Sequence, residues 1–166
     1  MPKTYEAIAT QTLGSTAASV TFSSIPSTYT DLVLVCNLGS TVAGQAIIMR
    51  ANGDSGSNYS FRTIRGNGST VIGEQQSNQT QVRISVAVDT STAAGNQNII
   101  TNIMNYSNTS TFKTFFGRAN NADVNGTEVN VSMWRSTTAI NQLLVGLTGS
   151  TFVAGSTFTL YGIKAA

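Results

Sequence analysis

The loop from residue 52 to residue 58 carries the side chains best spaced for holding a metal ion. Asn52, Asp54 and Asn58 occupy alternate positions together with Gly56, as oxygen ligands do in a calcium loop. Calcium takes about six to eight oxygens and usually several carboxylates, whereas this loop offers one carboxylate. We therefore predict a glycine-rich turn in which the Asn and Asp side chains hydrogen-bond to their own backbone, and we expect no metal site.

The remaining reactive side chains do not form a catalytic set. Histidine is absent, which excludes every triad with a histidine base and every imidazole metal site. Cys36 is the single cysteine, so internal disulfides and cysteine-rich zinc sites are excluded too. Catalysis by paired carboxylates needs two acids within about 5 to 10 Å, and no spacing in the chain proposes a pair. We expect neither an enzyme nor a cofactor. The acids are Glu6, Asp31, Asp54, Glu74, Asp89, Asp123 and Glu128.

Charge and hydropathy limit the partners. Nine Lys and Arg against seven Asp and Glu give a formal charge of +2, and the cations are spread singly along the chain. A nucleic-acid face needs clustered cations, so we expect no nucleic-acid partner. The longest apolar runs, Leu32–Cys36 and Leu143–Val145, are far shorter than the roughly 20 residues that cross a bilayer. The N-terminus lacks the apolar core of a signal peptide, and we expect a protein made in the cytosol without a membrane partner.

The length and the polar composition favour one domain that associates with other chains. A chain of 166 residues fits a single domain, residues 1–166, that buries about 70% of its unfolded surface. It contains 24 Thr, 19 Ser and 15 Asn but only 16 charged residues. A surface with few charges costs little to desolvate, and its hydroxyls and amides can pair across a contact with another copy. The same composition is also typical of some secreted and viral β-proteins that do not associate in this way.

Hydrophobic periodicity predicts an all-β fold. Val82, Ile84, Val86 and Val88 alternate with polar or small residues, which is typical of strands with one wet face. The segments are too close together for helices between them, so we predict an antiparallel β-sandwich, jelly-roll-like, of about 8 to 10 strands. The predicted strands are Tyr5–Thr12, Ala18–Phe22, Asp31–Asn37, Ala46–Ala51, Val82–Val88, Asn98–Asn105, Phe112–Arg118, Glu128–Met133, Gln142–Thr148 and Phe158–Ile163.

Turn residues lie between these segments. The pairs Asn52-Gly53, Asn67-Gly68 and Asn125-Gly126 supply the positive backbone angles of tight hairpins. Pro26 lacks a backbone donor and cannot lie in a central strand, so Ile25 and Pro26 are expected to fix a crossover connection.

Trp134 has two interpretations. Val129, Val131 and Met133 take one face of a strand, which leaves Trp134 on the opposite face. A tryptophan in this position packs under a loop at a sheet edge or lies at an interface with another chain. The pattern leaves both alternatives open.

Several segments resemble a family of proteins. Residues 25–35 (IPSTYTDLVLV), 52–60 (NGDSGSNYS), 112–117 (FKTFFG), 134–140 (WRSTTAI) and 155–163 (GSTFTLYGI) look like those of small virion structural proteins of tailed bacteriophages, cyanophages among them. The resemblance covers nearly the whole chain in the same order. It implies a jelly-roll-like sandwich displayed on the particle, most often as a trimer, either as a head decoration (cement) protein or as a tail or fibre component.

Two functional hypotheses follow. The first is a capsid decoration protein of the virion, assembled in the host bacterial cytoplasm, whose trimers bind the major capsid protein of the assembled head. In this hypothesis residues 1–10, with Lys3 and Tyr5, form an extended arm on the capsid, and Trp134 and Arg135 make an intersubunit contact. The second is a tail fibre or baseplate component, or a carbohydrate-binding module that stacks its aromatic residues on sugars. In both, the C-terminal strand with Phe158, Leu160 and Tyr161 completes the core.

Overall fold

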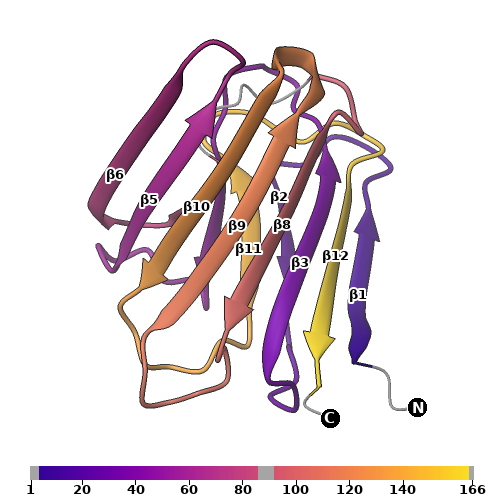
Figure 1. Ribbon diagram of the computed structural model, residues 1–166. Coiled ribbons are helices and arrows are strands. Elements are labelled where there is room, and N and C mark those ends of the chain that lie inside the picture. Colours follow the sequence, from indigo (N-terminus) through magenta and orange to yellow (C-terminus); the bar gives the residue numbers. More distant parts are fainter. Residues whose placement is uncertain (1–3, 86–91, 165–166) are drawn as a thin grey trace.

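The computed structural model describes residues 4–85 and 92–164, which form a two-layer β-sandwich (Figure 1). All strand pairs are antiparallel. An eight-stranded sheet has the order β1-β12-β3-β8-β9-β10-β5-β6, and a four-stranded sheet has the order β2-β11-β4-β7. The strands are β1 Tyr5–Thr12, β2 Ser19–Phe22, β3 Asp31–Leu38, β4 Ile47–Ala51, β5 Tyr59–Gly66, β6 Val71–Gln79, β7 Val82–Ser85, β8 Gln97–Met104, β9 Lys113–Asn121, β10 Gly126–Trp134, β11 Leu143–Leu147 and β12 Thr157–Ile163.

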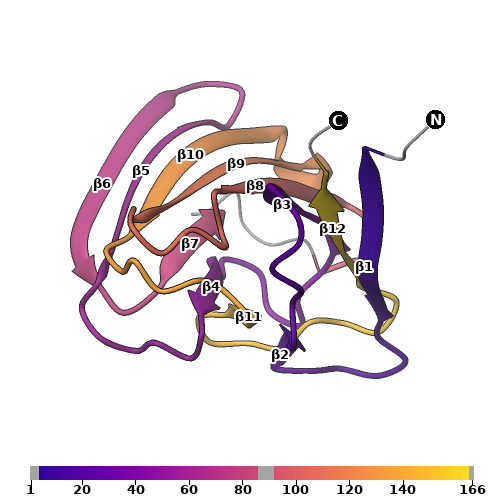
Figure 2. The ribbon, with the colours of Figure 1, turned by 90° about the horizontal axis from the view of Figure 1, so that it is seen from below.

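The larger sheet curves around the smaller one, so that its inner face covers the core and its outer face points to solvent (Figure 2). Buried apolar side chains of both layers form one cluster, for example Leu34 and Phe158 of the larger sheet and Met49 and Val145 of the smaller one. The predicted antiparallel β-sandwich is confirmed. Its two sheets are unequal, and among the described residues the only helical element is a 3-10 turn at Ala122–Val124. No helix within the described residues is long and apolar enough to cross a membrane.

Two strands were not predicted. β5 and β6 form a hairpin at one end of the larger sheet, joined through Asn67-Gly68 (Figure 1). β6 is exposed along most of its length, so its sequence lacks the apolar alternation that marks a half-buried strand. The ten predicted strands otherwise match observed strands within a few residues, except that residues 86–88 of the predicted Val82–Val88 strand lie outside the described residues.

The usual alternation is reversed along most of β10, because its polar side chains face the core and its apolar side chains face solvent. Glu128, Asn130 and Ser132 are buried, whereas Val129 and Val131 are exposed. The interior accepts the polar residues because they find partners there. Asn130 donates to the Ile84 carbonyl at 2.7 Å and Ser132 to the Arg83 carbonyl at 3.2 Å, which ties β10 to the edge strand β7 of the other layer.

The segment with Ile25 and Pro26 is a crossover, as predicted. It connects β2 of the smaller sheet with β3 of the larger one. The Tyr106 hydroxyl fixes it, since it donates to the Pro26 carbonyl and accepts from the Tyr29 amide at 3.3 Å. Asn52 and Gly53 have the expected positive φ angles of 53° and 68°, but they also lie in a crossover, from β4 to β5, and not in a hairpin.

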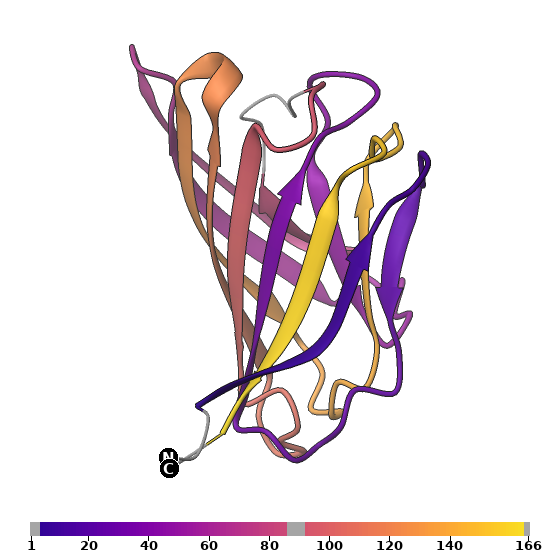
Figure 3. The ribbon, with the colours of Figure 1, turned by 90° about the vertical axis from the view of Figure 1, so that its right-hand side faces the viewer.

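The N-terminal segment lies in the sheet. From Tyr5 onward it forms the edge strand β1, paired with β12, so this part of the predicted arm is a strand, while residues 1–3 lie outside the described residues. β12 lies between β1 and β3 and buries Phe158 and Leu160 completely. Tyr5 pairs with Ile163, which places both ends of the sheet-forming chain at the same end of the sandwich (Figure 3).

Candidate interaction surface

Exposed apolar side chains gather on the outside of the larger sheet. They lie on the five neighbouring strands from β6 to β8, and the register places Ile64 opposite Val129 and Val131 opposite Phe116. Val71 is 79% exposed and Ile64 64% exposed. Contiguous apolar surface of this kind marks interaction sites on soluble proteins. We call this set the outer apolar face; its members are Ile64, Val71, Met104, Phe116, Val129 and Val131.

The charge on this surface is purely positive. Arg62 pairs in register with Val131, and Arg118 lies between Val129 and Ile100. Arg62 donates to the carbonyls of Phe61 at 2.8 Å and Gln76 at 3.2 Å. Arg118 is exposed and makes no hydrogen bond or ion pair within the part of the chain that the structure describes. No outward position of β5, β8, β9 or β10 carries an acid.

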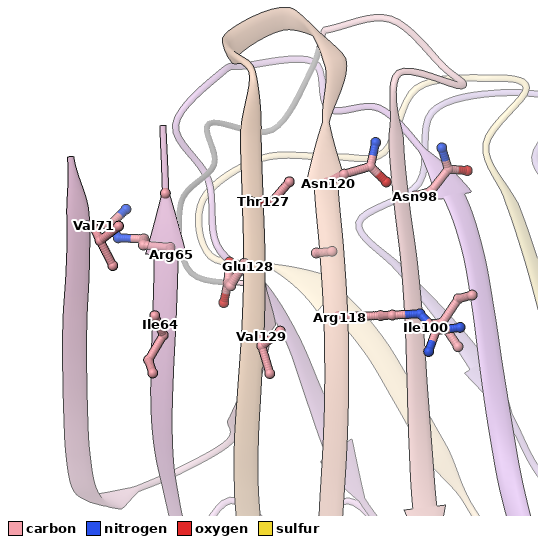
Figure 4. A pocket seen from close by; sticks show the side chains of 12 residues that line it. Ile64, Arg65, Val71, Asn98, Ile100, Arg118, Asn120, Thr127, Glu128 and Val129 are labelled. Atoms are coloured by element: carbon pink, nitrogen blue, oxygen red, sulfur yellow. The ribbon is translucent and has the colours of Figure 1, made fainter. Parts of the chain in front are cut away.

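A shallow depression of about 620 Å³ lies on the same face. Gly66 of β5 pairs with both Val71 and Thr127, and its missing side chain leaves the sheet surface low between them. Figure 4 shows Ile64 and Val129 lying side by side, with the Arg118 side chain extended toward Ile100. The depression therefore combines apolar walls with one unpaired guanidinium.

The inner side of the same strands holds a polar cluster that is closed to solvent. Glu128 is 3% exposed and accepts from Thr63 at 2.8 Å and from Ser85 at 3.1 Å. Ser85 also accepts from Gln97 at 3.3 Å. The cluster links strands of both sheets, and its burial prevents a substrate from reaching the carboxylate.

The loop after β4 is held by Asp54. Its Oδ2 accepts from Trp134 Nε1 at 2.6 Å and from Asn58 at 2.9 Å, and its Oδ1 accepts from the Gly56 amide at 2.7 Å. Burial raises the pKa of this carboxyl, but the hydrogen bonds from Trp134, Asn58 and Gly56 lower it by more, so the pKa lies below its ordinary value. The predicted self-capping turn is confirmed, since the loop uses its carboxylate for its own backbone and for Trp134. No group of three acidic or cysteine side chains that could hold a metal occurs within residues 4–85 and 92–164.

Trp134 is buried within the chain and Arg135 is half-buried at the end of β10, and their contact with a second subunit stays a prediction. Trp134 is 2% exposed and stacks on Tyr59 with ring centroids 6.1 Å apart. Of the two alternatives left open by the sequence, the structure shows the tryptophan packed under a loop. Arg135 donates to the Ser57 carbonyl at 2.7 Å and to Asn78 at 2.9 Å, and so ties the end of β10 to the same loop.

The other two predicted contact residues are placed differently. Tyr5 is 57% exposed on the edge strand and meets Tyr161 edge-on at 6.5 Å. Lys3 lies outside the described residues. Sequence reasoning missed Arg118 and the outer apolar face, although one signal was present. The exposed valines of β10 alternate with Glu128, Asn130 and Ser132, and only the structure shows that the polar set faces inward.

Comparisons with known proteins assign no family. No family model matches the chain, and no curated protein matches it either. Among solved structures, the chain is similar to a marine PL-14 alginate lyase from Aplysia kurodai, with 12% sequence identity and a TM-score of 0.31. The match covers 86% of this chain and 72% of the lyase. A likeness this distant carries no argument about substrate or activity.

Proposed function

We propose that this chain is a non-enzymatic structural protein of a tailed bacteriophage particle, and that it decorates the assembled head as a trimer. The observation that carries the proposal is the outer apolar face, because a sandwich with few charges presents six of its exposed large apolar side chains on the outside of five neighbouring strands. The resemblance of the chain to small virion proteins supports the class of particle and the trimer, and it allows either the head or the tail as the place of binding; of these two we propose the head.

The mechanism is mass action. A protein that binds the assembled shell, and not its free subunits, stabilises the shell in proportion to its occupancy. The chain needs no chemistry for this role. Within the described residues, the acids whose hydrogen bonds are given above, Asp54 and Glu128, serve to hold the fold.

Sedimentation with purified phage heads that lack this protein tests the proposal. We expect the chain to enter the pellet with the heads at micromolar concentration and to have the molar mass of a trimer by light scattering. Absence from the head pellet would overturn the proposed function. Binding to tails, or a specific signal on a glycan array, would instead support the tail component or the carbohydrate-binding module.

A further inference from the structure

The depression on the outer face of the larger sheet has a chemistry of its own. Its lining includes the apolar Ile64, Val129 and Ile100 from β5, β10 and β8, and the Arg118 side chain of β9 extends toward Ile100 (Figure 4). Glu128 also lines the depression, but its carboxylate accepts from Thr63 and Ser85 on the inner side of the sheet. An apolar group that also carries a negative charge satisfies both features at once. A neutral group would leave the guanidinium without an ionic partner.

We infer that this depression is the anchor point for a protein partner that inserts an apolar side chain next to a carboxylate. The inference rests on the proposed function, which makes the partner a neighbouring protein of the particle. Charge complementarity selects this occupant: the face offers two arginines and no acid, so a partner with carboxylates gains a charge-assisted hydrogen bond to Arg118.

A second copy of the chain fits the depression less well. When two outer faces meet, each brings Arg62 and Arg118 and no outward acid, and like charges facing one another oppose the contact. The acids of the neighbouring strands are used elsewhere. Glu74 pairs with Arg83 at 3.5 Å, and Glu128 is buried.

The test compares Arg118→Glu with a control of equal charge change on the opposite layer. Ser19→Glu combined with Thr21→Glu lowers the net charge by the same two units at exposed positions of β2. Both proteins are expected to fold like the wild type, because Arg118 makes no contact that the fold needs. We expect Arg118→Glu to weaken binding to bare heads about tenfold or more, because a few residues supply most of the binding energy of an interface. The control is expected to bind like the wild type. Equal binding by Arg118→Glu and the wild type would overturn the inference.

A small probe separates this inference from the proposed function. Anilinonaphthalene sulfonate is apolar and anionic, whereas Nile red is apolar and neutral. We expect the wild type to bind the anionic dye, Arg118→Glu to bind it about fivefold or more weakly, and both to bind Nile red alike. If the wild type fails to sediment with heads but the dye result holds, the proposed function fails and the apolar-anion site stands. If Arg118→Glu leaves the affinity for the anionic dye unchanged, the site itself is refuted.

Light scattering distinguishes a second copy from a different protein. We expect the molar mass of Arg118→Glu to equal that of the wild type over the same concentration range. A change of molar mass would assign the face to contact between copies and overturn the inferred partner.

Discussion

The ring of Tyr29 lies directly on Gly162. A Cβ atom placed on Gly162 would stand 2.3 to 2.5 Å from three ring carbons of Tyr29, closer than real contacts allow. Tyr29 follows the Ile25-Pro26 crossover, and its hydroxyl donates to Glu6 of β1 at 3.2 Å while its ring covers β12. Glu6 also forms an ion pair with Lys164 at 2.9 Å, so the crossover, β1 and the end of β12 are joined at this point.

Gly162→Ala is expected to destabilise the protein by about 3 kcal/mol, because the ring must leave its place and the crossover with it. Unfolding by denaturant, followed by the fluorescence of the single tryptophan, measures the change. Gly73→Ala is the matched control, since Gly73 also lies in a strand of the larger sheet but has nothing within 4 Å of the added Cβ. A similar loss for both variants would show that the ring contact is not the cause. Combining Gly162→Ala with Tyr29→Ala should cost less than the sum of the two single losses, since the clash is removed.

Asp54→Asn is expected to destabilise the protein by about 1 to 2 kcal/mol at pH 7, because hydrogen bonds to a charged acceptor become weaker or are lost. The effect depends on pH. Burial raises the folded-state pKa of Asp54, but its hydrogen bonds lower this pKa by more. The stabilisation that the carboxylate provides is therefore fully present above the ordinary pKa of 3.8. The contribution disappears as the pH falls through the lowered folded value. The free energies of unfolding of the wild type and of Asp54→Asn should therefore converge below about pH 4; a constant difference between pH 7 and pH 2.5 would contradict the role of the carboxylate.

Lys113→Met is expected to cost about 3 kcal/mol. The Lys113 side chain is fully buried, and its ammonium donates to the carbonyls of Asn108, Thr111 and Thr137 at 2.6, 2.7 and 3.2 Å. Methionine fills the space but leaves these carbonyls without their donor. Thermal unfolding measures the loss. Lys164→Met serves as the control, because Lys164 forms its ion pair on the surface and its loss should change the thermal midpoint little. Equal midpoints for the two variants would show that the buried ammonium does not hold together the loop between β8 and β9 and the loop between β10 and β11.

Cys36 reports on opening of the larger sheet. It is buried in β3, and burial raises the pKa of its thiol above the ordinary range, so the reactive thiolate is suppressed. Reaction with a thiol reagent at pH 8 should be at least about a hundredfold slower in the native protein than in denaturant. Val42→Cys in a Cys36→Ala background places the thiol at a position that is 53% exposed and should react at once. Fast labelling of native Cys36 would show that β3 opens easily.

Strands were predicted correctly from the sequence where one face of the strand is polar and faces solvent and the other face is apolar and buried. The boundaries of β1 were obtained to the residue, and the self-capping of Asp54 followed from the single carboxylate of its loop. Prediction failed for β6 because this strand is exposed along most of its length, so burial imposes no period on its sequence. It failed for β5 because that strand buries Thr63 and exposes Ile64, so its apolar residues do not mark the buried face. The outer apolar face was missed for a related reason. Alternation shows that β10 has two kinds of face, but only the partners of Asn130 and Ser132 on β7 decide which face is inside.

The order of strands in the larger sheet sets the timing of folding during synthesis. β12 fills the place between β1 and β3, yet the ribosome makes it after every other strand of the sandwich. Until β12 emerges, the nascent chain has two strand edges without their common neighbour, and the long sequence separation of the β1–β12 pair makes this step slow. Chaperones that shield open edges are therefore expected to act on the unfinished protein, and their release should coincide with the arrival of its C-terminal strand.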